Sequence, residues 1–150
     1  MFKHLFVPTD GSAMSSETVE KAIVFAQENG AKISFFYVKP EFPIALYGEG
    51  ALVDPTTPQQ FADLADQQAN AILERCREKA AAASIDCSTA SQTSGSIHAA
   101  IVKAAQACGA DLIFMASHGR RGLSSLLLGS ETYRVLTHST IPVLVFRKPV

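Results

Sequence analysis

The sequence predicts an α/β protein in which an open five-stranded parallel sheet carries helices on both faces. Two observations predict this class. Five short runs are almost continuously apolar, as strands buried on both faces require, and apolar residues recur at helical spacing between them. Strands that alternate with helices in this way form a parallel sheet with right-handed connections. No linker, repeat or low-complexity segment interrupts the pattern, so residues 1–150 are expected to form one domain.

The predicted elements alternate along the whole chain. The expected strands are Phe2–Val7, Ile33–Val38, Ile85–Thr93, Leu112–Ala116 and Ile141–Phe146. The third run is the least apolar, which places it near an edge of the sheet. Serine N-caps and helical periodicity place the helices. These helices are expected from Ser12 or Ser15 to Asn29-Gly30, through Phe61–Ala80, from Ser94 or Ser96 to Cys108-Gly109, and over Glu131–His138 with Ser130 as N-cap.

One connection is unusually long for a compact domain. It runs from Pro40 to Pro58 and contains four prolines and Gly48-Glu49-Gly50. Loops of this length are uncommon unless they are functional or mobile. The segment is therefore expected to be either a lid over a binding site or a mobile excursion.

Charge and composition exclude several classes of function. The net charge of −1 creates no field that attracts nucleic acid or anionic lipid. No apolar run has the length of a membrane span, and the N-terminus lacks the architecture of a signal peptide. The three cysteines, Cys76, Cys87 and Cys108, are widely spaced and form no CxxC pair, so reduced structural thiols are expected. We expect a cytoplasmic protein without nucleic-acid or membrane partners.

The stretch after the fourth strand has the features of an anion site. The strand breaks at Ser117-His118-Gly119, and after nine intervening residues comes Gly129-Ser130 at the start of a helix. The first N–H groups of a helix have no intrahelical partner, and the helix dipole adds partial positive charge there. Glycine lets the backbone approach a phosphate without a Cβ in the way.

A second loop is expected to join this one. Pro8-Thr9-Asp10-Gly11-Ser12 follows the first strand directly. In open α/β sheets, ligands bind beyond the carboxyl ends of the strands, where the strand order reverses. If the first and fourth strands are neighbours at that point, the two loops form one crevice.

These motifs together resemble the universal stress protein family over the whole chain. The matching segments are Leu5–Ser12, Phe36–Val38, Ser117–Leu123, Leu127–Ser130 and Pro142–Val145. The resemblance implies a Rossmann-like sheet, similar to the adenine nucleotide alpha hydrolases, with strand order 3-2-1-4-5. It also implies a homodimer formed through the last strand, and an ATP-binding branch whose motif is glycine, two residues, glycine, nine residues, and glycine with serine or threonine.

The chain departs from that motif at one position. Gly119, the nine-residue spacer, Gly129 and Ser130 all fit, but Ala116 replaces the first glycine. Its methyl group stands where the backbone should approach ribose and phosphate, and Glu131 adds a carboxylate to the first turn of the phosphate-facing helix. We expect ATP or another adenine nucleotide to bind in the micromolar range or more weakly, on the order of −8 kcal/mol or less favourable. A family member that binds no nucleotide is the alternative.

The resemblance assigns roles to individual residues. Asp10 would accept a hydrogen bond from the adenine or ribose edge, and its other interpretation is an Asx-turn after the strand. The backbone of Val38 would meet adenine, and the other interpretation of this residue is a buried strand terminus. Met115 would touch the base or belong to the core. The other residues of the expected nucleotide site are Pro8, Thr9, Ala116, His118, Gly119, Arg120, Arg121, Gly129, Ser130, Glu131 and Thr132.

No catalytic residue or metal cluster is predicted. His118 has no serine, cysteine or carboxylate at a spacing that implies a proton relay, so we expect it to contact ligand or solvent. Arg120 and Arg121 either neutralise phosphate charge or form a solvated loop face. Any Mg²⁺ would be held mainly by the phosphates.

The last strand predicts a homodimer. Ile141–Phe146 is hydrophobic and lies at a sheet edge, where Pro142 is tolerated. Antiparallel pairing with the same strand of a second copy would cover this edge, whereas the alternative is protection by the C-terminal residues 147–150.

Three functions remain open at this stage. The first is a stress-response or regulatory protein that acts through nucleotide-dependent conformation or partner binding. The second is a slow ATPase or a nucleotidyl- or phosphoryl-transferase, although the sequence shows no evident base or P-loop lysine. The third is a nucleotide-free dimeric adaptor.

Overall fold

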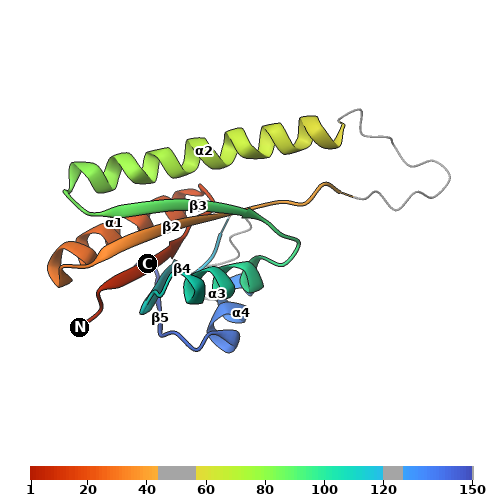
Figure 1. Ribbon diagram of the computed structural model, residues 1–150. Coiled ribbons are helices and arrows are strands. Elements are labelled where there is room, and N and C mark those ends of the chain that lie inside the picture. Colours follow the sequence, from red (N-terminus) through yellow and green to blue (C-terminus); the bar gives the residue numbers. More distant parts are fainter. Residues whose placement is uncertain (44–56, 120–126, 150) are drawn as a thin grey trace.

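The computed structural model describes residues 1–43, 57–119 and 127–149, which form a five-stranded sheet between two layers of helices (Figure 1). The strand order is β3-β2-β1-β4-β5, and each pairing is parallel. The predicted fold class and strand order are therefore confirmed. Most of the long connection between Pro40 and Pro58, together with Arg120 and Arg121, lies outside the described residues.

The strands occur where the apolar runs predicted them, with shifted ends. Their bounds are β1 His4–Pro8, β2 Lys32–Lys39, β3 Cys87–Thr93, β4 Leu112–Ala116 and β5 Val143–Phe146. The last strand starts two residues later than predicted because the Ser139 hydroxyl accepts the Ile141 N–H at 3.0 Å, which removes that amide from the sheet. Pro8 closes β1 rather than following it, since a strand's final residue can lack an N–H.

The helices follow their capping residues. Their bounds are α1 Ala13–Asn29, α2 Pro58–Ala82, α3 Ile97–Ala107 and α4 Ser130–His138. Ser12 caps α1 by accepting the Ser15 N–H, and Gly30 ends the helix with φ +60°. The prediction that Ser130 caps α4 is wrong: Gly129 is the N-cap, and its lack of a side chain means that no side-chain capping bond forms.

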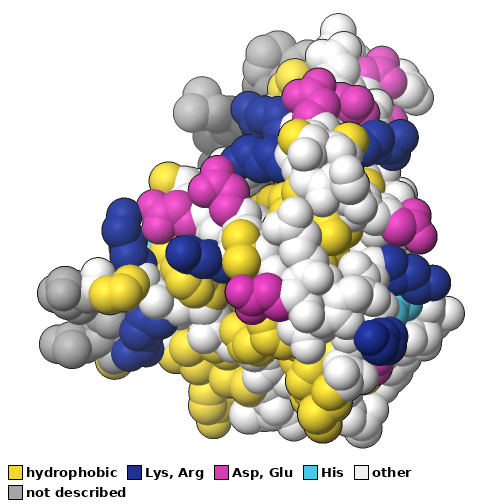
Figure 2. Space-filling view, turned by 90° about the vertical axis from the view of Figure 1, so that its left-hand side faces the viewer, with side chains coloured by type: hydrophobic (Ala, Val, Ile, Leu, Met, Phe, Trp, Pro, Cys, Tyr) yellow, Lys and Arg dark blue, Asp and Glu magenta, His cyan; other side chains and the backbone are white. Residues whose placement is uncertain are grey.

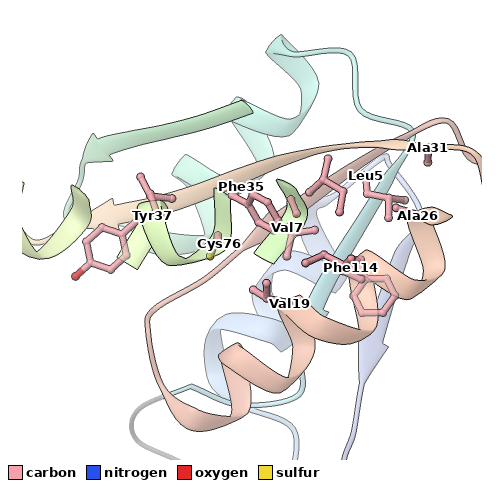
Figure 3. Packing of buried hydrophobic residues seen from close by; sticks show 14 of the residues in the cluster. Leu5, Val7, Val19, Ala26, Ala31, Phe35, Tyr37, Cys76 and Phe114 are labelled. Atoms are coloured by element: carbon pink, nitrogen blue, oxygen red, sulfur yellow. The ribbon is translucent and has the colours of Figure 1, made fainter. Parts of the chain in front are cut away.

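The sheet separates two hydrophobic clusters. Leu5 and Val7 of β1 point toward α1 and α2, where they pack with Phe35 and Phe114 (Figure 3). Phe6, between them in sequence, packs on the opposite face with the residues of α3 and α4. This alternation explains why the central strands read as continuous apolar runs, since both of their faces are buried.

A polar chain crosses the sheet near its amino end. His4 Nε2 lies 2.7 Å from Ser34 Oγ, and Ser34 Oγ lies 2.9 Å from the Ser88 hydroxyl on β3. Burial lowers the pKa of His4, assisted by the positive charge of Lys32 and opposed by Asp111 and by a hydrogen bond to the Gly109 backbone. His4 is therefore a neutral, hydrogen-bonded core histidine at neutral pH.

The lowered pKa of His4 predicts acid-sensitive stability. Below the ordinary histidine pKa of about 6.5, the unfolded chain takes up a proton before the folded chain does. The free energy of unfolding should therefore fall as the pH drops from 7 to 5, by about 1.4 kcal/mol for each unit of pKa lowering. Urea denaturation of His4→Gln should show a shallower decline over this range. Above pH 7.5, where His4 is neutral in both states, the two proteins should run parallel; equal slopes below pH 6.5 would contradict the assignment.

Candidate functional site

The loops after β1 and β4 leave the sheet side by side. β1 pairs with β4 through Leu5 with Leu112 and Phe6 with Ile113, so the two strands are neighbours, as the crevice requires. Both strands point the same way, and their carboxyl ends therefore share one edge of the sheet. Strand order reverses at this position, because β2 and β3 lie beyond β1 while β5 lies beyond β4.

The two loops touch at Asp10 and Gly119. A Cβ added to Gly119 would collide with Asp10 Oδ2, so a side chain at this position would displace the Asp10 carboxylate. The other carboxylate oxygen, Oδ1, accepts the Ser12 N–H at 2.9 Å in an Asx-turn, and Gly11 between them has φ +76°. The two interpretations of Asp10 are therefore compatible: one oxygen holds the turn while the other faces the opposite loop.

Gly129 closes the second loop on itself. Its N–H donates to the Ser117 carbonyl at 2.7 Å, and a Cβ at this position would lie 3.0 Å from His118 Cα. The residue pair 117–118 is thus pinned against the start of α4. Ser117 is a fully buried polar residue of this site that the sequence analysis did not single out, since nothing in a lone serine indicates a carbonyl acceptor.

Ala116 occupies its position without backbone strain. It ends β4 opposite Phe146 of β5, in extended conformation, and not in the positive-φ region that would require glycine. Its carbonyl accepts the Thr132 hydroxyl at 2.9 Å, so the side chain of Thr132 anchors α4 to the end of β4. The replacement of glycine therefore acts only through its methyl group.

Some residues expected to line the nucleotide site are buried in the core or already hydrogen-bonded within the protein. Met115 is 6% exposed and belongs to the core cluster beside α3 and α4, and the half-buried Val38 packs against the same cluster. The Thr9 hydroxyl is already engaged by the Ser15 hydroxyl at 2.7 Å. Pro8 is half-buried at the end of β1.

Glu131 is directed toward α3. Its carboxylate accepts the His98 N–H at 2.9 Å and lies 2.9 Å from the guanidinium of Arg134. Ser96, the N-cap of α3, makes no side-chain capping bond, so Glu131 supplies a cap from a different helix. The carboxylate also lies 3.5 Å from His98 Nδ1, a buried atom that lacks a hydrogen bond within the described residues.

The first turn of α4 presents amides that have no acceptor within the helix. Ser130 is the first helical residue and is exposed, and the Tyr133 N–H is the first to bond back, to the Gly129 carbonyl. The amides of residues 130–132 consequently have no intrahelical acceptor, which is the arrangement that binds anions. The half-buried His118 ring lies beside the Ser117 hydroxyl, with 3.2 Å between Nδ1 and Oγ.

Within residues 1–43, 57–119 and 127–149, no group of three or more histidine, cysteine or acidic side chains is arranged to hold a metal ion. Among the helices of these same ranges, none is long and apolar enough to cross a membrane. The three cysteines are free thiols.

Comparison with known proteins identifies the family. The model of the universal stress protein family matches residues 1–147. The chain belongs to this family. Universal stress protein YxiE of Bacillus subtilis is 31% identical over 98% of this chain and its own full length. Universal stress protein MJ0531 of Methanocaldococcus jannaschii is 31% identical over 99% of this chain and 84% of its own length.

Solved structures share the fold over nearly the whole chain. Hypothetical protein MJ0577 superposes with a TM-score of 0.82 at 25% identity, covering 100% of this chain and 99% of that one. A universal stress protein in complex with cAMP gives a TM-score of 0.70 at 23% identity, covering 99% of both chains. A family protein from Arabidopsis thaliana with AMP bound gives 0.69 at 16% identity, covering 99% and 93%.

The capping role of Glu131 yields a stability prediction. Glu131→Ala removes the acceptor for the His98 N–H and should lower the free energy of unfolding by about 1 kcal/mol, as the loss of a helix cap does. Urea denaturation at pH 7 measures this change. Glu17→Ala, which breaks an exposed pair with Lys148, is the matched control and should cost less. Equal midpoints for Glu131→Ala and the unaltered protein would refute the cap.

Proposed function

We propose that this universal stress protein binds an adenine nucleotide, ATP in particular, in the crevice between the loops after β1 and β4. The observation that carries the proposal is the contact of Asp10 with Gly119, which joins the two loops near the α4 amides that have no intrahelical acceptor. Relatives of the same fold are recorded in complex with cAMP and with AMP, which supports the same ligand class here.

The phosphates would lie on the first turn of α4. The amides of Ser130, Glu131 and Thr132 would donate to them, and Gly119 and Gly129 would let the backbone approach closely. The Glu131 carboxylate, which the sequence suggests would repel a triphosphate, already bonds to His98 and Arg134. The Arg134 guanidinium therefore partly compensates the charge of this carboxylate, which reduces its repulsion of the phosphates.

The adenosine end would lie toward β1 and β2. Asp10 would accept from the ribose or adenine edge, and Pro8, Thr9, Val38 and Met115 would form the walls. Because Met115 and the Thr9 hydroxyl are engaged by the protein, their part in the walls would be one of shape. Mg²⁺ would be held mainly by the phosphate oxygens, as suits a small, hard cation.

The protein would act as a cytoplasmic stress-response regulator through nucleotide-dependent conformation or partner binding. Nucleotide contacts at Gly119 and at the start of α4 would change the surface that these residues present to a partner. The free thiols suit a reducing compartment.

A homodimer formed through β5 would cover the exposed edge of the sheet. β5 is an edge strand, and all four of its residues are only half-buried. Pro142 O accepts the Ile113 N–H and Phe146 O accepts the Ser117 N–H, so even-numbered residues face β4 and the backbone groups of Val143 and Val145 face outward. Figure 2 shows hydrophobic side chains gathered along the lower edge, at the level where Figure 1 places β5 and α4.

Calorimetry with MgATP tests the nucleotide site. Gly129→Asp places a side chain and a negative charge beside His118 and the proposed phosphates, and should abolish binding. Gly129→Ala adds only the methyl group and should weaken binding less. Ser96→Asp adds the same charge at the N-cap of α3 and should bind like the unaltered protein. Unchanged affinity in Gly129→Asp would place the phosphates elsewhere.

Sedimentation analysis tests the dimer. Val145→Pro removes an N–H that faces away from β4, and should convert the dimer to a folded monomer because antiparallel pairing loses a donor. Val145→Ala shortens the side chain but keeps the N–H, and should remain dimeric. A Val145→Pro protein that stays dimeric with an unchanged circular dichroism spectrum would exclude β5 as the interface.

A further inference from the structure

A small hollow lies behind the turn that carries Asp10. It has a volume of about 40 Å³ and opens between α1 and α2, on the opposite side of the sheet from α3 and α4. A water needs about 10–15 Å³ of such space, so the hollow has room for a small polyatomic group. The residues that line it include Thr9, Gly11, Ser16, Arg75, Cys76 and Lys79.

The α2 wall of the hollow is positively charged. Arg75 has no ion pair or hydrogen bond within the described residues, whereas Lys79 Nζ lies 2.7 Å from Glu20 Oε1. Arg75 and Lys79 carry two positive charges, and Glu20 balances only one of them. The hollow therefore has an excess positive charge, although the net charge of the chain is −1.

Cys76 contributes no negative charge to the hollow. Burial raises the pKa of its thiol to about 11, although the nearby charges of Lys79 and Arg75 act in the opposite direction. The thiol is therefore protonated at neutral pH. Cys76 of α2 and Val19 of α1 both belong to the hydrophobic core and line the hollow, so part of its wall is apolar (Figure 3).

The remaining polar groups suit an oxyanion. The hydroxyl of Ser16, in the first turns of α1, forms no hydrogen bond within the described residues, and Gly11 approaches with φ +76° and no side chain. A guanidinium donates two parallel hydrogen bonds to a phosphate, and an ammonium adds a point charge. A cation would be repelled by Arg75 and Lys79, and a large apolar ligand would not fit.

We propose that this hollow binds a phosphate group, either as inorganic phosphate or as the terminal group of a small phosphomonoester. Arg75 is its principal ligand, and Lys79 and Ser16 contribute further donors. The hollow shares Thr9 with the walls of the proposed nucleotide crevice, but its charged side chains come from α2, whereas the proposed phosphate-binding amides lie at the start of α4.

Calorimetry with inorganic phosphate at constant ionic strength tests the site. The measurement uses the full chain with Gly129→Asp, which blocks phosphate at the start of α4 and so separates the two sites. Saturable binding should persist there, and adding Arg75→Gln should weaken it about tenfold, the loss of a charge-assisted hydrogen bond. Arg77→Gln is the matched control: Arg77 lies on the same helix but bonds to Thr89 and Glu74, so phosphate affinity should not change.

A gain of affinity is expected from removing the competing carboxylate. Glu20→Gln frees Lys79 and should tighten phosphate binding several-fold, whereas Glu28→Gln makes the same charge change at the far end of α1 and should not. Repeating the titration with glycerol phosphate identifies the source: binding of both compounds assigns a phosphomonoester, and binding of inorganic phosphate alone assigns the free ion. Absence of saturable binding by either, or equal affinity with and without Arg75→Gln, would overturn the proposal.

Discussion

The contact between the Asp10 carboxylate and the backbone of Gly119 is the constraint on which the site depends. β1 and β4 are hydrogen-bonded neighbours, so the segments that follow them leave the sheet together, and a Cβ at Gly119 would displace the Asp10 carboxylate that lies against it. Gly129 also makes a close backbone contact: its amide donates to the Ser117 carbonyl, and a Cβ at Gly129 would crowd the backbone of His118. A crevice lined by backbone groups requires small residues more than it requires reactive ones.

The first turn of α4 is held from two sides. Thr132 bonds to the end of β4 through the Ala116 carbonyl, and Glu131 bonds to the beginning of α3 through the His98 amide. These two hydrogen bonds tie the turn to β4 and α3, so its backbone amides keep a fixed direction. A binding site gains affinity when its groups are oriented before the ligand arrives, because less conformational entropy is lost on binding.

Local sequence patterns were sufficient for most of the fold. A strand buried on both faces must be apolar at every position, and Leu112–Ala116 was therefore predicted with its observed bounds. Ser12 and Gly30 mark the ends of α1 through contacts within a few residues. The start of β5 was predicted too early, because it depends on the Ser139 side chain competing for a backbone amide, and apolar periodicity carries no record of that competition.

The sequence by itself determined the element order, the parallel sheet and the two loops that would meet, because these follow from periodicity and from the carboxyl-end rule for such sheets. Only the tertiary structure decided what the polar side chains do. Ser130 is a residue type that often caps helices, yet it makes no capping bond. Glu131 instead caps α3 by accepting the N–H of His98, which lies 33 residues away in the sequence. Hydrogen bonds between distant segments depend on how the helices and the sheet pack, and no local sequence pattern specifies that packing.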